Sequence, residues 1–304
     1  MTDYGHDLRF GTFITPIAQP AMHAVDLALV ADRAGLDLAT FNDHPYQSSY
    51  HDTWTLLAYV ASRTTHIHVS GNVLSLPLRQ PAVLARSAAS LDLLSGGRFE
   101  LGLGAGVSWD AIEAMGGRRL TPGQSISALE EAITIIRAMW ATDQRGGVRV
   151  NGTYYQVNGA QRGPAPAHDI GIWIGAFKPR ILTLTGRVAD GWLPTLAGLP
   201  GGLADLEEMN KYIDEGAAAA GRDPSKVRRL LNISGQFARS GRSLLNGPPQ
   251  QWAEELAGIT LEYGVSGFIL AADDAPAIER FAAEVAPATR ERVAAERARR
   301  YVRM

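Results

Sequence analysis

The chain has 304 residues and no cysteine; 46% of the residues are hydrophobic, 20% are charged, and the formal net charge is −2. These values are typical of a globular protein with one large domain or two modest ones, and they give no indication of nucleic-acid binding. They exclude disulfides, thiolate metal sites and a cysteine nucleophile, and because we find no signal peptide and no membrane-spanning run, we expect a cytoplasmic protein without a membrane partner.

Strand and helix patterns alternate along the chain. The expected strands cover residues 8–14, 36–40, 67–74, 98–106, 170–176, 190–194, 228–238 and 267–272. The expected helices cover residues 20–35, 53–63, 81–97, 126–140, 203–221 and 249–264, with two more beginning at 179 and at about 275. Residues 148–158 predict a β-hairpin between strands four and five, with a turn at Asn151–Gly152. Eight strand–helix pairs favour a single α/β domain over residues 1–304, a (β/α)₈ TIM barrel with insertions, rather than an open Rossmann sheet.

Polar side chains follow the second expected strand. Asn42, Asp43 and His44 come directly after its buried pattern, and Pro45 stops any extension. In a TIM barrel the catalytic groups lie where strands give way to helices, and a histidine beside a carboxylate suits proton transfer. The segment is therefore either a reaction centre or a polar cap on the strand.

Glycines interrupt the third and fourth strands. Gly71 indicates a bulge or a close backbone approach to a ligand, or is simply a tolerated glycine. The run "LGLGAG" (101–106) is not a dinucleotide fingerprint. Gly104 and Gly106 either ease the exit of the strand or allow a flat ring to approach the backbone.

A tight turn follows the fifth strand. Pro179 occupies a plausible first helical position after Ala176, Phe177 and Lys178. Free N–H groups at this helix start, with Lys178 and Arg180 beside them, would suit a phosphate. The alternative is an ordinary helix start with two solvated cations.

Two histidines of the third strand raise the possibility of a metal. His66 and His68 are two residues apart, a spacing known from metal-binding barrels, but they begin the strand and so belong to the structural end of the barrel. The remaining histidines, among them His168, have no partner visible in the sequence. We therefore expect no metal site.

Together these segments resemble the luciferase-like monooxygenase superfamily of flavin- and coenzyme F420-dependent oxidoreductases. The resemblance is carried by "NDHP" after strand two, by residues 70–106 and 152–192, and by the C-terminal region that begins "EYGVSGFILAADD". It covers essentially the whole chain, and it implies the (β/α)₈ barrel already expected from the element pattern.

The resemblance also implies FMN or coenzyme F420 (a 5-deazaflavin), bound without a covalent link. F420-using relatives have an Asp-His pair that matches Asp43, expected to touch the ring, and His44, expected to donate or accept the proton. A bulge with a cis non-proline peptide would back the ring at about Gly71–Asn72. The implied cofactor residues are Asp43, Ser70, Gly71, Asn72, Ala105, Gly106, Val107, Ala176, Phe177 and Lys178, and the substrate pocket would include Thr15 and Thr195.

The chain departs from sugar-phosphate-using relatives at two places. Those relatives carry an acidic residue after strand one and a lysine after strand six, whereas residues 15–20 and 196–200 are uncharged here. We therefore expect a coenzyme F420-dependent oxidoreductase that moves a hydride between the deazaflavin and a small neutral organic substrate, with His44 as proton donor or acceptor.

Three alternatives stay open. The first is a reduced-FMN-dependent monooxygenase of the same family, and the second is a metal-dependent hydrolase barrel that uses His66 and His68. The third is a flavin-binding barrel without catalytic activity. Members of the family are commonly dimers, so we expect a homodimer that binds a small-molecule substrate and no nucleic acid.

Overall fold

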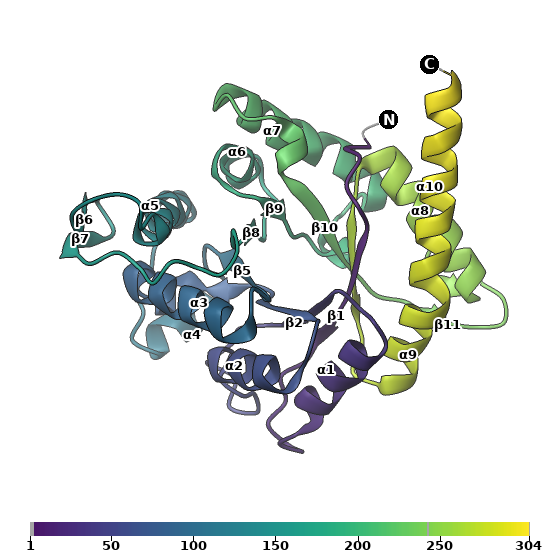
Figure 1. Ribbon diagram of the computed structural model, residues 1–304, viewed down its shortest axis with the longest axis horizontal. Coiled ribbons are helices and arrows are strands. Elements are labelled where there is room, and N and C mark those ends of the chain that lie inside the picture. The colour runs from purple at the N-terminus through teal and green to yellow at the C-terminus, as the bar shows by residue number, and fades with distance from the viewer. Residues whose placement is uncertain (1–2, 242, 304) are drawn as a thin grey trace.

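A closed barrel of eight parallel strands forms the centre of the molecule (Figure 1). The computed structural model describes residues 3–241 and 243–303. The barrel strands are β1 (Arg9–Ile14), β2 (Leu38–Phe41), β3 (His68–Gly71), β5 (Phe99–Gly104), β8 (Ile172–Ile174), β9 (Gly191–Trp192), β10 (Arg228–Ile233) and β13 (Gly267–Ala271). Pairing runs from β3 through β2, β1, β13, β10, β9 and β8 to β5, and β5 pairs back with β3. The predicted (β/α)₈ fold is confirmed.

Helices surround the barrel and connect successive strands (Figure 1). They are α1 (His23–Arg33), α2 (Thr53–Arg63), α3 (Pro81–Ser95), α4 (Trp109–Ala114), α5 (Pro122–Trp140), α6 (Pro179–Val188), α7 (Asp205–Ala219), α8 (Pro249–Tyr263), α9 (Ala275–Arg280) and α10 (Ala286–Arg303). A π-helical stretch (Phe281–Val285) joins α9 to α10, and single 3₁₀ turns cover Leu76–Leu78, Leu196–Gly198, Gly202–Ala204 and Pro224–Lys226. The short helix α4 was not predicted, because the glycine pair after it and the irregular segment before it mask its pattern.

Local signals explain several helix boundaries. Asp52 caps α2 by accepting the N–H of Thr55 at 2.8 Å. Thr121 and Gln124 form a reciprocal capping box at the start of α5. Gly264 ends α8 in the left-handed conformation, with φ of 72°.

The hairpin predicted between the fourth and fifth barrel strands, which are β5 and β8, is present, but its turn is longer than predicted. β6 (Val148–Asn151) pairs antiparallel with β7 (Gln156–Ala160), and Asn151 is a paired strand residue opposite Gln156. The loop between the strands covers residues 152–155, so the predicted two-residue Asn-Gly turn is wrong. The carboxylate of Glu131 on α5 accepts the N–H groups of three loop residues, and this anchor supports the longer loop.

The third barrel strand is interrupted where it reaches the carboxyl face. β3 ends at Gly71, and after two residues β4 (Leu74–Ser75) resumes pairing with the end of β5. β5 passes close to this break, since a Cβ on Gly102 would lie 2.0 Å from the carbonyl oxygen of Gly71. Glycine at 102 therefore permits the close approach that shapes this rim of the barrel.

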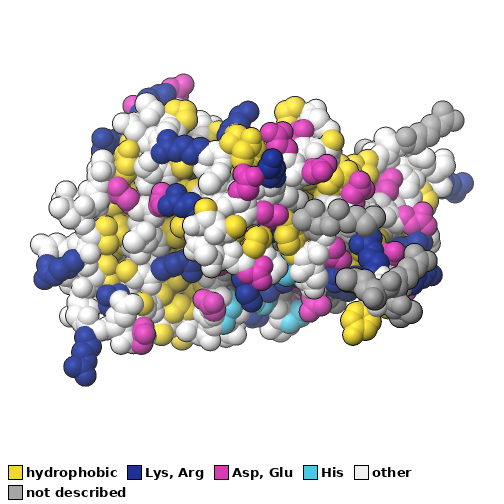
Figure 2. All heavy atoms as spheres, turned by 90° about the horizontal axis from the view of Figure 1, so that it is seen from above, with side chains coloured by type: hydrophobic (Ala, Val, Ile, Leu, Met, Phe, Trp, Pro, Cys, Tyr) yellow, Lys and Arg dark blue, Asp and Glu magenta, His cyan; other side chains and the backbone are white. Residues whose placement is uncertain are grey.

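The surface carries mixed charge on the side drawn in Figure 2. Basic and acidic side chains are interspersed there, without an extended patch of one sign. Two short strands, β11 (Gln236–Phe237) and β12 (Asn246–Gly247), form a separate small pair after β10. In the part of the chain that the structure describes, no helix combines the length and apolar character needed to cross a membrane.

Candidate active site

A cavity of about 510 Å³ opens at the carboxyl ends of the barrel strands. It is lined by Asp43, His44, Tyr46, Asn72, Val73, Leu74, Ser75, Gly104, Ala105, Gly106, Val107, Gly175, Ala176, Phe177, Lys178, Ile181, Leu193, Thr195 and Asn232. Five separate parts of the sequence that were each predicted to be functional thus meet at one place: Asp43–His44, Asn72, Ala105–Val107, Ala176–Lys178 and Thr195. Its position agrees with the general rule that TIM-barrel sites lie at this face.

Asp43 contributes to the wall of the cavity through a buried ion pair. Its side chain is fully buried, and its oxygens accept Arg79 Nε at 3.0 Å and Nη2 at 2.9 Å. The backbone N–H of Ser75 donates to the same carboxylate at 2.8 Å. Both oxygens are therefore engaged by protein donors, which fixes the loop that carries His44 and favours a positioning role over direct contact with a ring.

His44 lies beside this ion pair and is half-buried at the cavity wall. Its ring stacks on Tyr46, with centroids 5.4 Å apart and planes inclined by 17°. Its carbonyl accepts the N–H of Gln47 at 2.9 Å, which closes the turn after β2. The imidazole is thus oriented by stacking and by a fixed backbone at the mouth of a cavity, an arrangement suited to proton transfer.

A hydrogen-bonded pair of amides crosses the floor of the cavity. Asn72 Nδ2 donates to Asn232 Oδ1 at 2.7 Å, and Asn232 Nδ2 donates back to Asn72 Oδ1 at 3.2 Å. Asn72 also donates to Thr40 Oγ1 at 3.1 Å, and Asn232 to Thr195 Oγ1 at 3.4 Å. These contacts hold Asn72 and Thr195 in place from opposite sides of the barrel.

The cis non-proline peptide lies one position later than predicted. It joins Asn72 to Val73, not Gly71 to Asn72. The ladder with β2 explains the difference, because Gly71 still pairs with Phe41 and the N–H of Asn72 still donates to the Phe41 carbonyl at 2.7 Å. The chain turns only after these contacts, and Val73 then lines the cavity.

Of the two cations predicted to suit a phosphate at the turn before α6, Lys178 lines the cavity and Arg180 does not. Ala176, Phe177 and Lys178 line the cavity and lead to Pro179 at the first helical position. The carbonyl of Ala176 is held by the indole N–H of Trp192 at 2.9 Å. Arg180, however, turns away and donates to Ser127 at 2.9 Å. Lys178 is therefore the cation available for an anionic group at this turn.

Three predicted site residues do not line the cavity. Ser70 is fully buried and donates to the carbonyl of Gly71 at 3.0 Å. A Cβ on Gly71 would lie 2.5 Å from the Leu74 side chain, so glycine at this position leaves room for Leu74 at the break between β3 and β4. Thr15 donates through its hydroxyl to Asp273 at 2.7 Å, on the opposite side of the barrel mouth.

Two residues of the candidate site were not predicted: Arg79, which pairs with Asp43, and Asn232, which lines the cavity. Asn232 is a single polar residue within the apolar run of β10, and this break in the pattern was a usable signal. Arg79 precedes a helix in a loop without any distinguishing pattern. Its role depends on a partner 36 residues away, which the sequence alone does not reveal.

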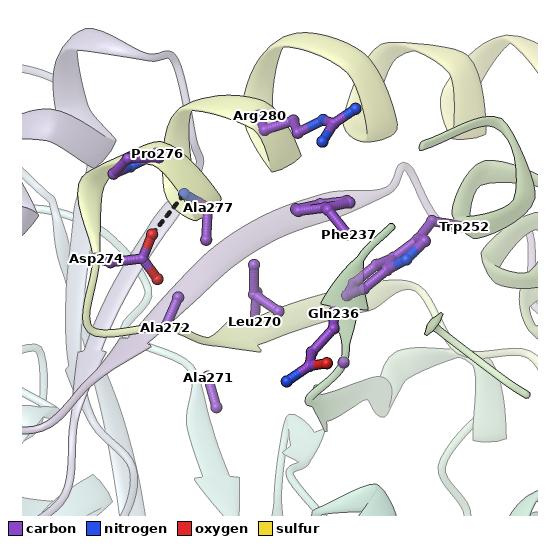
Figure 3. A pocket seen from close by; sticks show the side chains of 11 residues that line it. Gln236, Phe237, Trp252, Leu270, Ala271, Ala272, Asp274, Pro276, Ala277 and Arg280 are labelled. Carbon is purple, nitrogen blue, oxygen red and sulfur yellow. Dashed lines mark hydrogen bonds between the residues drawn. The ribbon is translucent and has the colours of Figure 1, made fainter. Parts of the chain in front are cut away.

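A second pocket of about 380 Å³ lies between β13, α8 and α9 (Figure 3). Two of its polar side chains have partners, since Asp274 caps α9 by accepting the N–H of Ala277 at 2.9 Å and Arg280 donates to Glu284 at 3.1 Å, whereas the buried Nε1 of Trp252 has none among the described residues. Arg280 lies 5.1 Å from the ring of Phe237, which in turn stacks on Trp252. None of the predicted site residues lies there, so we assign the candidate active site to the larger cavity.

Comparison with known proteins identifies the family of the chain. The family model for luciferase-like monooxygenase matches residues 8–242. The F420-dependent glucose-6-phosphate dehydrogenase of Nocardia farcinica is 32% identical over 217 residues, which cover 69% of this chain and 63% of the relative. The enzyme of the same name from Mycolicibacterium smegmatis is 31% identical, with 69% and 63% covered. These alignments thus span a little under two thirds of the length of each relative.

Solved structures share the fold. An F420-dependent secondary alcohol dehydrogenase, in complex with an F420–acetone adduct, superimposes with a TM-score of 0.81 at 19% identity, covering 93% of this chain and 99% of the other. The long-chain alkane monooxygenase LadA gives 0.77 at 14% identity, with 96% and 92% covered. Because the family model matches residues 8–242 of 304, the chain belongs to the luciferase-like monooxygenase family.

Proposed function

We propose that this protein is a coenzyme F420-dependent oxidoreductase that acts on a small neutral organic substrate. The observation that carries the proposal is the convergence of His44, the Asn72–Val73 peptide and the turn at Lys178 around one cavity. The relatives with about 30% identity are F420-dependent by name, which supports the deazaflavin over FMN. A cytoplasmic location, expected from the absence of cysteine and of a signal peptide, stays a prediction.

The residues around the cavity fit a flat ring with a phosphate tail. Gly104 and Gly106 leave room beside Val73 and Trp109, where a Cβ would lie 2.7 Å and 2.9 Å from the respective side chains. The ring would therefore lie against the backbone of Asn72–Val73. Lys178 and the free N–H groups at the start of α6 would hold the phosphate.

His44 would hold or remove the proton at the reacting oxygen of the substrate. When bound, the deazaflavin supplies or accepts the hydride. The imidazole would be held in position for this transfer, because its ring stacks on Tyr46 and its loop is fixed by the Asp43–Arg79 pair. Thr195 and Asn72, held by Asn232, would orient the polar end of the substrate.

A neutral substrate agrees with the charges at the cavity. Among the described residues that line it, Lys178 is the one lysine or arginine, and it lies at the turn proposed for the cofactor phosphate. Thr195 and Leu193 line the remaining side without a positive charge. An anionic sugar would therefore lack a cationic partner, in contrast to what the names of the relatives from Nocardia and Mycolicibacterium suggest for those proteins.

A paired titration tests the cofactor. Purified chain would be titrated with F420 and separately with oxidised and reduced FMN, following ligand and tryptophan fluorescence. We expect saturable F420 binding that is at least about tenfold tighter than FMN binding, a difference of about 1.4 kcal/mol. Tight binding of reduced FMN alone would instead assign the protein as an oxygen-consuming monooxygenase, and binding of neither would refute the proposal.

Replacing Gly104 by alanine tests the contact with the ring. Its Cβ would lie 2.7 Å from Val73 Cγ2, so this side chain, which lines the cavity, would have to shift. We expect F420 binding to weaken about tenfold, since overpacking of this kind costs about 1–3 kcal/mol. Gly258→Ala on α8 is the control, because its Cβ would meet no atom within 4 Å and Gly258 does not line the cavity. Equal affinities of the two variants would contradict the assignment.

We further propose that the chain forms a homodimer through α3. Val83 and Leu94 are 65% and 88% exposed, and their separation of 11 residues places them on the same side of the helix. Light scattering after size-exclusion chromatography should give twice the chain mass for the wild type and the single chain mass for Leu94→Glu. Leu244→Glu, which alters an exposed leucine elsewhere, should stay dimeric. A monomeric wild type would refute this proposal.

A further inference from the structure

Three side chains capable of binding a metal converge at the amino-terminal end of the barrel. His68 begins β3, Glu100 lies on β5, and His168 lies in the segment that leads to β8. One ligand atom from each, the two ring nitrogens and a carboxylate oxygen, lies within 4.8 Å of the others.

The contacts within this cluster are too long to be hydrogen bonds. His68 Nδ1 lies 3.6 Å from Glu100 Oε1, and His168 Nε2 lies 3.9 Å from Glu100 Oε2. Both ring nitrogens are buried and have no hydrogen-bond partner among the described residues. Ligands about 2.1 Å from a tetrahedral zinc ion are about 3.4 Å apart, and the two histidine–carboxylate separations are close to this value.

A carboxylate behind His168 orients this ring toward the cluster. Asp92 Oδ1 lies 2.8 Å from His168 Nδ1, and Asp92 is fully buried. The other oxygen of Asp92 accepts the backbone N–H groups of Ala167 and His168. Because a carboxylate accepts, Nδ1 carries the proton, and in the neutral ring Nε2 presents its lone pair toward Glu100. Metal-bound histidines commonly have such a carboxylate partner.

Two hydrogen-bond donors already contact the carboxylate of Glu100 and would compete with a metal ion for its oxygens. Arg9 Nη1 donates to Oε1 at 3.1 Å and the N–H of Gly171 donates to Oε2 at 2.8 Å. A carboxylate has about four lone-pair positions, so both donors leave room for a metal. The guanidinium of Arg9 nevertheless reduces the attraction of Glu100 for a cation.

We infer that His68, Glu100 and His168 form a binding site for a divalent transition-metal ion of the zinc class. Two imidazoles and one carboxylate are a donor set that suits zinc, with water completing the coordination. The site lies at the opposite end of β3 from the catalytic cavity, so its role is to tie β3, β5 and the segment before β8 together. His66, the other histidine considered from the sequence, is not part of it, because its ring pairs with Asp32 at 3.1 Å.

Zinc uptake by the full-length chain tests this inference. The purified protein would be stripped with a chelator, incubated with zinc ions, and its bound metal measured by elemental analysis and titration. We expect one zinc per chain, and an affinity that falls at least about 10- to 100-fold in His68→Ala and in His168→Ala. His66→Ala is the matched control and should bind zinc like the wild type.

A further variant keeps the test decisive if the histidine variants fail to fold. Arg9→Met retains all three ligands and removes the competing guanidinium, so it should bind zinc at least as tightly as the wild type. No zinc uptake by the wild type, undiminished uptake by the His68→Ala/His168→Ala double variant, or weaker binding by Arg9→Met would overturn the inference. Because these readouts measure bound metal, they are independent of F420 binding and turnover.

Discussion

Replacing His44 by alanine is expected to lower kcat by about 100- to 10,000-fold, the usual contribution of a positioned acid or base. F420 binding should change little, because the ring would be held mainly by backbone at Asn72–Val73 and at the turn before α6. The measurement is steady-state turnover with an alcohol or ketone substrate, accompanied by a fluorescence titration with F420. A loss in kcat without a matching loss in affinity would identify His44 as the proton donor or acceptor.

His51→Ala provides the control for this variant. His51 lies in the same region but its ring contacts the carbonyl oxygen of Ala21 at 2.9 Å, and it does not line the cavity. Its replacement should leave kcat and F420 affinity near the wild-type values. If His44→Ala retained full turnover while binding F420 normally, the proton would have another carrier, and a flavin-binding protein without this catalytic role would become the better interpretation.

The parts of the site that could be predicted are those encoded by contiguous sequence. Asn42, Asp43 and His44 follow a buried strand directly, so the barrel rule alone placed them at the carboxyl face. The turn before α6 was visible for the same reason, since Pro179 marks the first helical position. The boundaries of α2 were also predictable, because Asp52 and the change in pattern after Arg63 are local signals.

The parts that could not be predicted depend on contacts between distant segments. The cis peptide lies at Asn72–Val73 because the β2 ladder continues through Gly71, and a sequence pattern does not report where a ladder stops. The cluster of His68, Glu100 and His168 has the same origin. Its members come from β3, from β5 and from the segment before β8, and only the closed fold brings them together.

Arg79 is the clearest example of a residue whose role depends on a contact with a distant segment, and its replacement is expected to have a large effect on stability. Arg79→Met would leave the carboxylate of Asp43 fully buried without its bidentate partner. Removing one partner of a buried ion pair costs about 3–5 kcal/mol, because an uncompensated charge remains in the interior. We therefore expect a decrease of this size in the free energy of unfolding, measured by urea denaturation at neutral pH.

The double variant Asp43→Asn/Arg79→Met separates the burial of charge from the loss of contacts. It removes the uncompensated carboxylate, so it should recover much of the stability lost in Arg79→Met, a coupling that a double-mutant cycle measures. Arg292→Met is the matched control. It breaks an arginine–carboxylate pair with Glu254 in which both side chains are largely solvent-exposed, and it should cost less than about 1 kcal/mol. If Arg79→Met were as mild as Arg292→Met, the Asp43–Arg79 pair would not be what fixes the loop of His44, and the orientation of this histidine would depend on its stacking with Tyr46 alone.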